Sequence, residues 1–190
     1  VWCPPCNQMK SSLFKDAGFI RETQAFVPVY LDGDSKGAQQ WGERFGISGY
    51  PTVIILRSDG TEIARISSST MAGQLPALLK TAAGRTMSTD DLLAKAKADP
   101  AKLTTDDWQV LGAFDWRDDP KHFKDATTAG PLLDKLARAA PQPALQRRFA
   151  LLALVVVGSG CGGGGRSSRT TAKKPKKEAA PKLTKGQFIS

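Results

Sequence analysis

The chain has 190 residues, of which 41% are hydrophobic, and a formal net charge of +9. This length and apolar content fit one compact domain with an appendage and exclude a wholly disordered chain. The longest apolar run, residues 149–157, is shorter than the roughly 20 residues of a transmembrane helix. Three cysteines are too few for a disulfide-stapled scaffold.

The positive charge is confined to the C-terminal part of the chain. Residues 1–140 contain 17 Lys and Arg and 17 Asp and Glu, whereas residues 141–190 contain ten Lys and Arg and one acid, Glu178. The net charge therefore says nothing about the partners of the N-terminal part. For the basic end we expect salt-sensitive, non-specific adhesion to polyanions and no specific nucleic-acid partner.

The N-terminal part is predicted to begin with a helix and a strand. Apolar side chains recur at helical spacing from Cys6 to Ala17, and Gly18 suits the end of such a helix. Residues 26–31 are predicted as a strand. Pro28 places this strand at a sheet edge or next to a bulge, because proline has no N–H for a ladder.

A second helix and a β-hairpin are predicted next. The helix is short and is expected to end at Gly46. Residues 52–56 are apolar without alternation, as in a strand covered on both faces, and residues 58–60 turn the chain into a second strand at 61–66. A third amphipathic helix is predicted to end near Gly84.

Beyond residue 84 the pattern predicts helices only. Two helices begin at a hydroxyl residue that can cap them, and two more follow at 131–140 and 144–157. Together they form a small all-helical region over residues 85–157. We expect Trp116 and Phe123 in its core.

The end of the chain, residues 158–190, is rich in glycine and then in lysine. It carries too little apolar surface to offset the entropy of ordering, so we predict a disordered tail. The chain thus divides into residues 1–84, which alternate helices and strands, the helical region 85–157 and this tail.

Two cysteines stand close together where the first helix is predicted to begin, in the sequence Trp-Cys-Pro-Pro-Cys over residues 2–6. If Cys3 is the N-cap, Pro4 and Pro5 take the first helical positions, where a missing N–H costs little. Cys6 then offers its backbone N–H to the Cys3 sulfur. The positive end of the helix dipole favours the thiolate at Cys3, and Cys6 can attack a mixed disulfide formed there.

This motif, together with Gly-Tyr-Pro-Thr at residues 49–52, resembles the thioredoxin-like disulfide oxidoreductases over residues 1–84. The resemblance implies an α/β, three-layer thioredoxin-like fold and a redox-active centre for thiol–disulfide exchange on protein substrates. In this interpretation Cys3 is the nucleophile, lying farther from apolar packing, and Cys6 is the resolving thiol. The implied partners are protein thiols or disulfides and a redox partner, and no cofactor or metal is required.

The resemblance also implies a substrate-binding surface made by Trp2, Tyr50 and Pro51. The Tyr50–Pro51 peptide bond is expected to be cis, with Pro51 facing the cysteine pair. A role in cell redox homeostasis would follow. By analogy with exported family members that carry appended helices, we expect a periplasmic or otherwise extracytoplasmic location, with the cytoplasm as the alternative.

Two departures from the family pattern limit which properties of the family can be expected of this chain. The middle pair is Pro-Pro where thioredoxin has Gly-Pro, so neither the redox potential nor the choice among reductant, oxidant and isomerase is transferred. The strand that precedes the cysteine pair in the family is not part of this sequence. We therefore expect a fold that lacks its first strands, in which residues 26–31 and 52–56 lose the strand between them and activity is poor.

Two other interpretations of the cysteine pair stay open. One is a redox-inert thioredoxin-like module that binds proteins. The other is a metal-binding chaperone, because soft thiolates select Cu(I), and Cys161 and His122 could nominally complete a zinc site with the pair. Cys161 stands in a glycine tract without ligand spacing, and no Met-rich or His-rich set accompanies the pair, so disulfide exchange is preferred.

Overall fold

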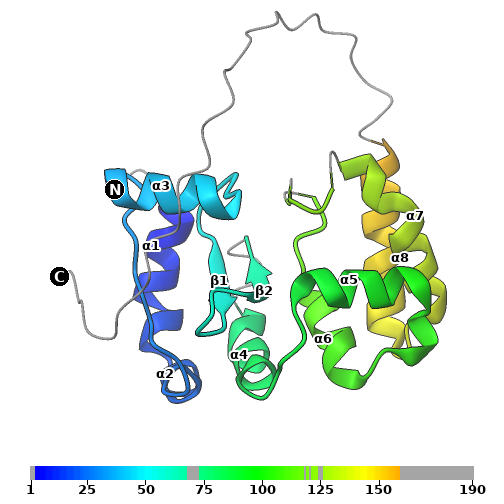
Figure 1. The fold of residues 1–190 in the computed structure, drawn as a ribbon, viewed down its shortest axis with the longest axis horizontal. Helices are drawn as coiled ribbons and strands as arrows, with labels where there is room; N and C mark the ends of the chain where they lie inside the picture. The colour runs from blue at the N-terminus through cyan, green and yellow to red at the C-terminus, as the bar shows by residue number, and fades with distance from the viewer. Residues whose placement is uncertain (1–2, 68–72, 118, 120, 124–125, 159–190) are drawn as a thin grey trace, which may run out of the picture.

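The computed structural model describes residues 3–67, 73–117, 119, 121–123 and 126–158. Figure 1 shows helices around a small sheet, laid out along one long axis. Helices α1 to α3 lie at one end, α7 and α8 at the other, and the hairpin with α4 to α6 between them (Figure 1). Trp2 and the predicted disordered tail, apart from Gly158, lie outside the described residues.

Three short helices open the structure: α1 (Pro4–Ser11), the 3₁₀ turn η1 (Leu13–Lys15) and α2 (Ala17–Thr23). The prediction of one helix from residue 6 to 17 is therefore wrong. The Ser12 hydroxyl donates to the Gln8 carbonyl oxygen at 2.7 Å. Local side-chain bonds of this kind offer the backbone an alternative to helix continuation.

The start of α2 explains why Gly18 does not stop a helix. Asp16 is the N-cap of α2, and its carboxylate accepts from the Phe19 backbone N–H at 2.7 Å. Gly18 therefore lies in the first turn of a new helix and not beyond the end of an old one.

Residues 26–31, predicted as a strand, form no strand in the structure. A strand needs a neighbour to share its backbone hydrogen bonds. Within the described residues the sheet consists of β1 and β2 alone, and Pro28 has no N–H to contribute. The segment leaves Val27 and Val29 79% and 74% exposed. The strand prediction is thus wrong.

Helix α3 (Lys36–Phe45) and the hairpin confirm the predictions for this part of the chain. Gly46 closes α3 at a φ of 60°, a left-handed conformation that glycine adopts without steric cost. Strand β1 (Val53–Leu56) pairs antiparallel with β2 (Glu62–Ile66). Gly60, at a φ of 84°, lies in the turn between them.

The rest of the described chain is helical, as predicted. Ser88 and Thr104 cap the second and third of its main helices through their hydroxyl oxygens. Among the described residues, no helix is long and apolar enough to cross a membrane. The elements are α4 (Leu75–Ala83), α5 (Thr89–Ala98), η3 (Pro100–Lys102), α6 (Thr105–Ala113), η4 (Ala126–Ala129), α7 (Gly130–Ala139) and α8 (Pro143–Gly158).

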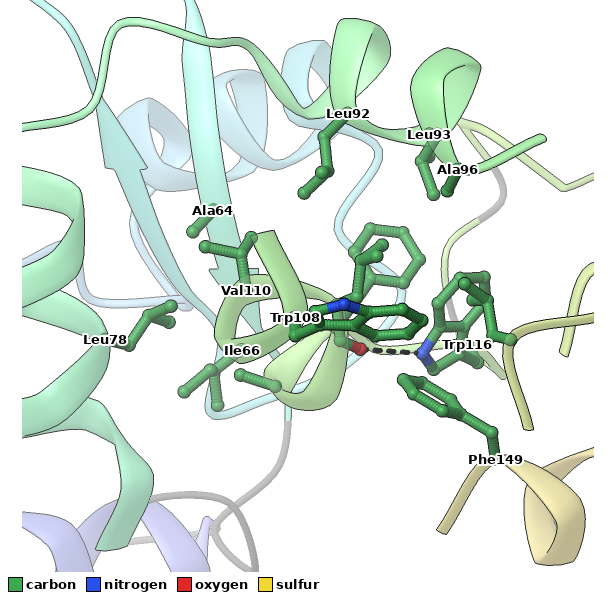
Figure 2. Packing of buried hydrophobic residues seen from close by; sticks show 14 of the residues in the cluster. Ala64, Ile66, Leu78, Leu92, Leu93, Ala96, Trp108, Val110, Trp116 and Phe149 are labelled. Atoms are coloured by element: carbon green, nitrogen blue, oxygen red, sulfur yellow. Dashed lines mark hydrogen bonds between the residues drawn. The ribbon is translucent and has the colours of Figure 1, made fainter. Parts of the chain in front are cut away.

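One hydrophobic cluster runs through the hairpin and the helical region. In Figure 2, Ile66 of β2 lies on one side of this cluster and Trp116 on the other. Trp116 is 1% exposed, and its Nε1–H donates to the Leu111 carbonyl oxygen at 3.0 Å. Phe123 is also buried, so both expected core residues are confirmed. The cluster crosses residue 84, and the hairpin and the helices therefore pack as one unit.

Candidate functional site

The cysteine pair lies at the first turn of α1. Cys3 is the N-cap, and its sulfur accepts from the Cys6 backbone N–H at 3.3 Å. Pro4 and Pro5 occupy the first two helical positions, where no intrahelical donor is needed. The Cys3 carbonyl oxygen accepts from the Asn7 N–H at 3.1 Å and so begins the helical ladder. The cap therefore has the geometry predicted from the spacing of these residues.

Cys3 and Cys6 are joined by a disulfide, with their Cα atoms 5.3 Å apart. Cys3 is 9% exposed and belongs to the buried residues, whereas Cys6 is half-buried. The expectation that Cys3 lies farther from apolar packing is therefore wrong. What distinguishes Cys3 as a nucleophile is its place at the helix N-terminus, where the Cys6 N–H can stabilise charge on its sulfur.

Helix α1 is attached to the rest of the molecule through a few side chains. Met9 is 3% exposed and belongs to the hydrophobic cluster, and Leu13 packs against that cluster after the helix ends. On the outer side, the Lys10 ammonium lies 4.5 Å from the centre of the Tyr30 ring, a cation–π contact with the segment 26–31. These contacts determine where α1 presents the cysteine pair.

Tyr50 and Pro51 lie in the turn that precedes β1, and the peptide bond between them is cis. Tyr50 is 39% exposed and packs against Gly33, where an added Cβ would come within 2.8 Å of the ring. The Thr52 hydroxyl donates to the Gly49 carbonyl oxygen at 2.7 Å and holds the turn. In Figure 1 the first turn of α1, helix α3 and the start of β1 are drawn toward the same side of the view.

A family comparison identifies this part of the chain. Residues 1–83 match the family model of the thioredoxin-like domain. We call residues 1–83 the thioredoxin-like domain after this match. The resemblance drawn from the cysteine motif and the Gly-Tyr-Pro-Thr sequence is confirmed, and the Cys3–Cys6 disulfide is compatible with a disulfide-related function. Neither the curated proteins nor the solved structures contain a match to the chain.

A buried ion pair fastens the hairpin of the thioredoxin-like domain, and the sequence analysis missed it. Arg65 Nη2 lies 2.8 Å from Glu62 Oε2, with the two side chains 1% and 4% exposed. The same guanidinium donates to the Phe45 carbonyl oxygen at 2.7 Å, at the end of α3. Charged residues in a strand usually indicate an exposed face, so no sequence signal pointed to this pair.

A second missed cluster surrounds His122, on the loop after Trp116. Its Nδ1 lies 2.5 Å from Asp119 Oδ2, and its Nε2 lies 2.6 Å from Asp90 Oδ1. Burial disfavours the charged imidazole, but the hydrogen bond and negative charge of Asp119, with help from Asp90, outweigh burial and raise the pKa of His122. The two ring nitrogens of His122 are thus hydrogen-bonded to carboxylates and not placed beside cysteines.

The metal-binding interpretation gains no support from these positions. Among the described residues, no group of three or more His, Cys, Asp and Glu side chains is placed to hold a metal ion. Cys161, which a zinc site would need, lies outside the described residues.

A third charged cluster lies between α5 and α6. Asp107 is buried and accepts from Arg85 Nη1 at 2.8 Å, from Lys95 Nζ at 2.7 Å and from the Thr104 N–H at 3.0 Å. Burial alone would raise the pKa of Asp107, but the bond from Lys95 and then those from Thr104 and Arg85 lower it to about 2. Asp107 therefore stays ionised and ties the loop after α4 to two helices.

Proposed function

We propose that the thioredoxin-like domain catalyses thiol–disulfide exchange on protein substrates through Cys3 and Cys6. The observation that carries the proposal is the disulfide at a helix N-terminus, with the Cys3 sulfur as acceptor of the Cys6 N–H. A helix N-terminus lowers the energy of a thiolate, and the thiolate is the reactive form. The pair is thus placed for reversible exchange and is not merely a staple between distant segments.

The proposed cycle begins with the reduced pair. The Cys3 thiolate attacks one sulfur of a substrate disulfide, forms a mixed disulfide and releases the other substrate sulfur as a thiolate. Deprotonated Cys6 then attacks the Cys3 sulfur, which re-forms the Cys3–Cys6 disulfide and releases the second substrate thiol. Two electrons pass to the substrate, and a dithiol redox partner returns them. The reverse sequence oxidises a substrate dithiol.

We propose that substrates contact Tyr50 and Pro51, together with Trp2. The exposed ring of Tyr50 and the lack of an N–H on Pro51 support a surface on which a polypeptide can lie. For Tyr50→Ala we expect KM to rise more than kcat falls, because the ring takes no part in the exchange itself. An extracytoplasmic location belongs to the same proposal and can be tested by cell fractionation.

Two measurements on the full chain test the exchange. The first is insulin-disulfide reduction with a dithiol as electron donor, comparing the unchanged chain with Cys3→Ser, Cys6→Ser and the control Cys161→Ser. We expect both variants of the pair to lose turnover and the control to keep it. If all four proteins reduce insulin no faster than the dithiol alone, the cysteine pair carries no exchange, and the domain is a redox-inert binding module.

The second measurement assigns the roles of the two cysteines. After reduction, alkylation at mildly acidic pH is followed by mass spectrometry of the peptide that carries both residues. We expect Cys3 to be labelled first, and the Cys6→Ser variant to trap mixed disulfides through Cys3. Faster labelling of Cys6, the more exposed residue, would reverse the assignment.

A further inference from the structure

Helix α8 carries exposed apolar side chains that the redox site does not use. Leu151, Leu154 and Val155 are 63%, 70% and 49% exposed. Together with Arg147 they occupy positions i, i+4, i+7 and i+8, so they share one side of the helix. The other side packs on the helical region, where Phe149 is fully buried. The solvent side of α8 is thus apolar, with a basic residue at its start.

A shallow groove of about 400 Å³ runs beside this side of α8. The Nε of Arg148 is buried and has no hydrogen-bond partner among the described residues. Burial lowers the pKa of Arg148, although the charge of Asp115 opposes this. The groove therefore holds positive charge that is only partly compensated. Its lining consists of Arg117, Ala144, Arg147, Arg148, Leu151, Leu152 and Val155.

The sequence around the groove adds charge of the same sign. Helix α8 contains two arginines and no acid, and residues 159–190 contain eight Lys and Arg with one acid. A second copy of this surface would therefore repel the first, and the chain's own basic end is equally unsuited to cover it. The occupant has to be anionic and has to offer an apolar phase.

We propose that this surface, made by Arg117, Arg147, Leu151, Leu154 and Val155 and called here the α8 face, docks on an anionic phospholipid bilayer. Leucine and valine side chains can enter the boundary between headgroups and acyl chains, and arginines can meet the phosphates. A nucleic acid would match the charge but would leave the apolar side chains in water. The bilayer surface satisfies both properties of the α8 face.

The position of α8 makes docking compatible with the redox proposal. Figure 1 places α8 at the end of the molecule away from α1, the helix that begins at the cysteine pair. The two proposals can therefore fail separately, since no residue of the α8 face belongs to the redox site.

Co-sedimentation of the full chain with vesicles tests the proposal. We expect binding to phosphatidylcholine vesicles that contain phosphatidylglycerol, little binding to phosphatidylcholine alone, and weaker binding at high salt. For the double variant Leu151→Glu/Leu154→Glu, the partition coefficient onto these anionic vesicles should fall by about tenfold or more. The substitutions remove the apolar contact and add repulsion from the anionic headgroups. Its control, Val27→Glu/Val29→Glu, changes two equally exposed side chains near α1 and should bind like the unchanged chain.

Equal binding by both double variants would overturn the proposal, since the basic end alone would then carry the charge effect. Absence of binding to the anionic vesicles would overturn it as well. Thermal melting checks that the leucine variant folds. If it does not fold, a second pair of variants tests the proposal. Arg117→Glu/Arg147→Glu should bind the anionic vesicles more weakly than its control, Arg21→Glu/Arg138→Glu. The two control side chains lie outside the α8 face and are 72% and 79% exposed. Insulin-disulfide reduction should be the same in every variant that folds.

Discussion

The thioredoxin-like domain and the helical region differ in how much apolar surface they bury. In the helical region Trp108, Trp116 and Phe149 are at most 4% exposed, and the Phe149 ring packs against both indole rings. In the thioredoxin-like domain the segment after α2 leaves large side chains in water, with Val27 and Tyr30 79% and 63% exposed.

The cysteine pair belongs to the less buried of the two regions. Helix α1 has eight residues, and one of them, Met9, is buried. The hairpin, in contrast, shares the cluster of the helical region through side chains such as Ile66. Stability and the proposed chemistry are therefore carried by different parts of the chain, and the hairpin connects them.

Truncation of the central aromatic residue should produce the largest effect. Trp116→Ala removes a fully buried indole and its hydrogen bond to Leu111, which should lower the free energy of unfolding by about 4 kcal/mol. Phe14→Ala, in the thioredoxin-like domain, should cost less than about 1 kcal/mol because Phe14 is 37% exposed. Urea denaturation followed by circular dichroism measures both. Similar losses would contradict the difference between the regions.

The attachment of the hairpin to α3, within the thioredoxin-like domain, can be weakened at Arg65. Arg65→Met leaves the buried Glu62 with only the Lys121 ammonium, at 3.9 Å, as an ion-pair partner among the described residues. It also removes the donor to the carbonyl oxygen of Phe45. We therefore expect a loss of about 3 kcal/mol in the free energy of unfolding. Arg57→Met is the control, because the pair of Arg57 with Asp59 is exposed and should contribute less than about 1 kcal/mol. Equal losses would show that the buried pair does not connect the hairpin to α3.

Acid should weaken the helical region through Asp107. Its pKa is lowered from 3.8 to about 2 in the folded chain, so its ionised form contributes about 2 kcal/mol of stability above pH 3.8. This contribution is lost as the pH falls through about 2. Asp107→Asn should be less stable than the unchanged chain at neutral pH, and the difference should shrink in acid. A difference independent of pH, measured by denaturation across this range, would contradict the ion-pair origin.

The smallest effect is expected at His122 and has the opposite sign. Its pKa is raised by Asp119 and Asp90, so the stability from the charged ring is complete below the ordinary value of 6.5 and is lost as the pH rises through the folded value. The effect is small because burial of the ring disfavours its charged form and offsets much of what Asp119 and Asp90 contribute. The melting temperature should therefore fall as the pH rises through the folded pKa of His122. His122→Gln should remove this fall. Persistence of the fall would assign it to another group.

Features that depend on residues within one or two helical turns could be predicted from the amino-acid sequence. The cap at Cys3 follows from two prolines and an N–H three residues later, and the end of α3 follows from Gly46. Ser88 and Thr104 likewise begin their helices as predicted. Local hydrogen bonds and steric limits decide these features, so the candidate cysteine site and its cap geometry could be predicted before the fold was known.

Features that need a partner from a distant part of the sequence could not be predicted before the fold was known. Residues 26–31 have strand-like composition but lack a neighbouring strand in the described structure, because pairing depends on which elements lie beside them. Asp90 meets His122 across 32 positions of sequence, a contact that no local pattern encodes. The greater burial of Cys3 than of Cys6 also follows from packing around α1. Spacing along the chain determines a cap, whereas burial and charge pairing depend on which surfaces come together when the chain folds.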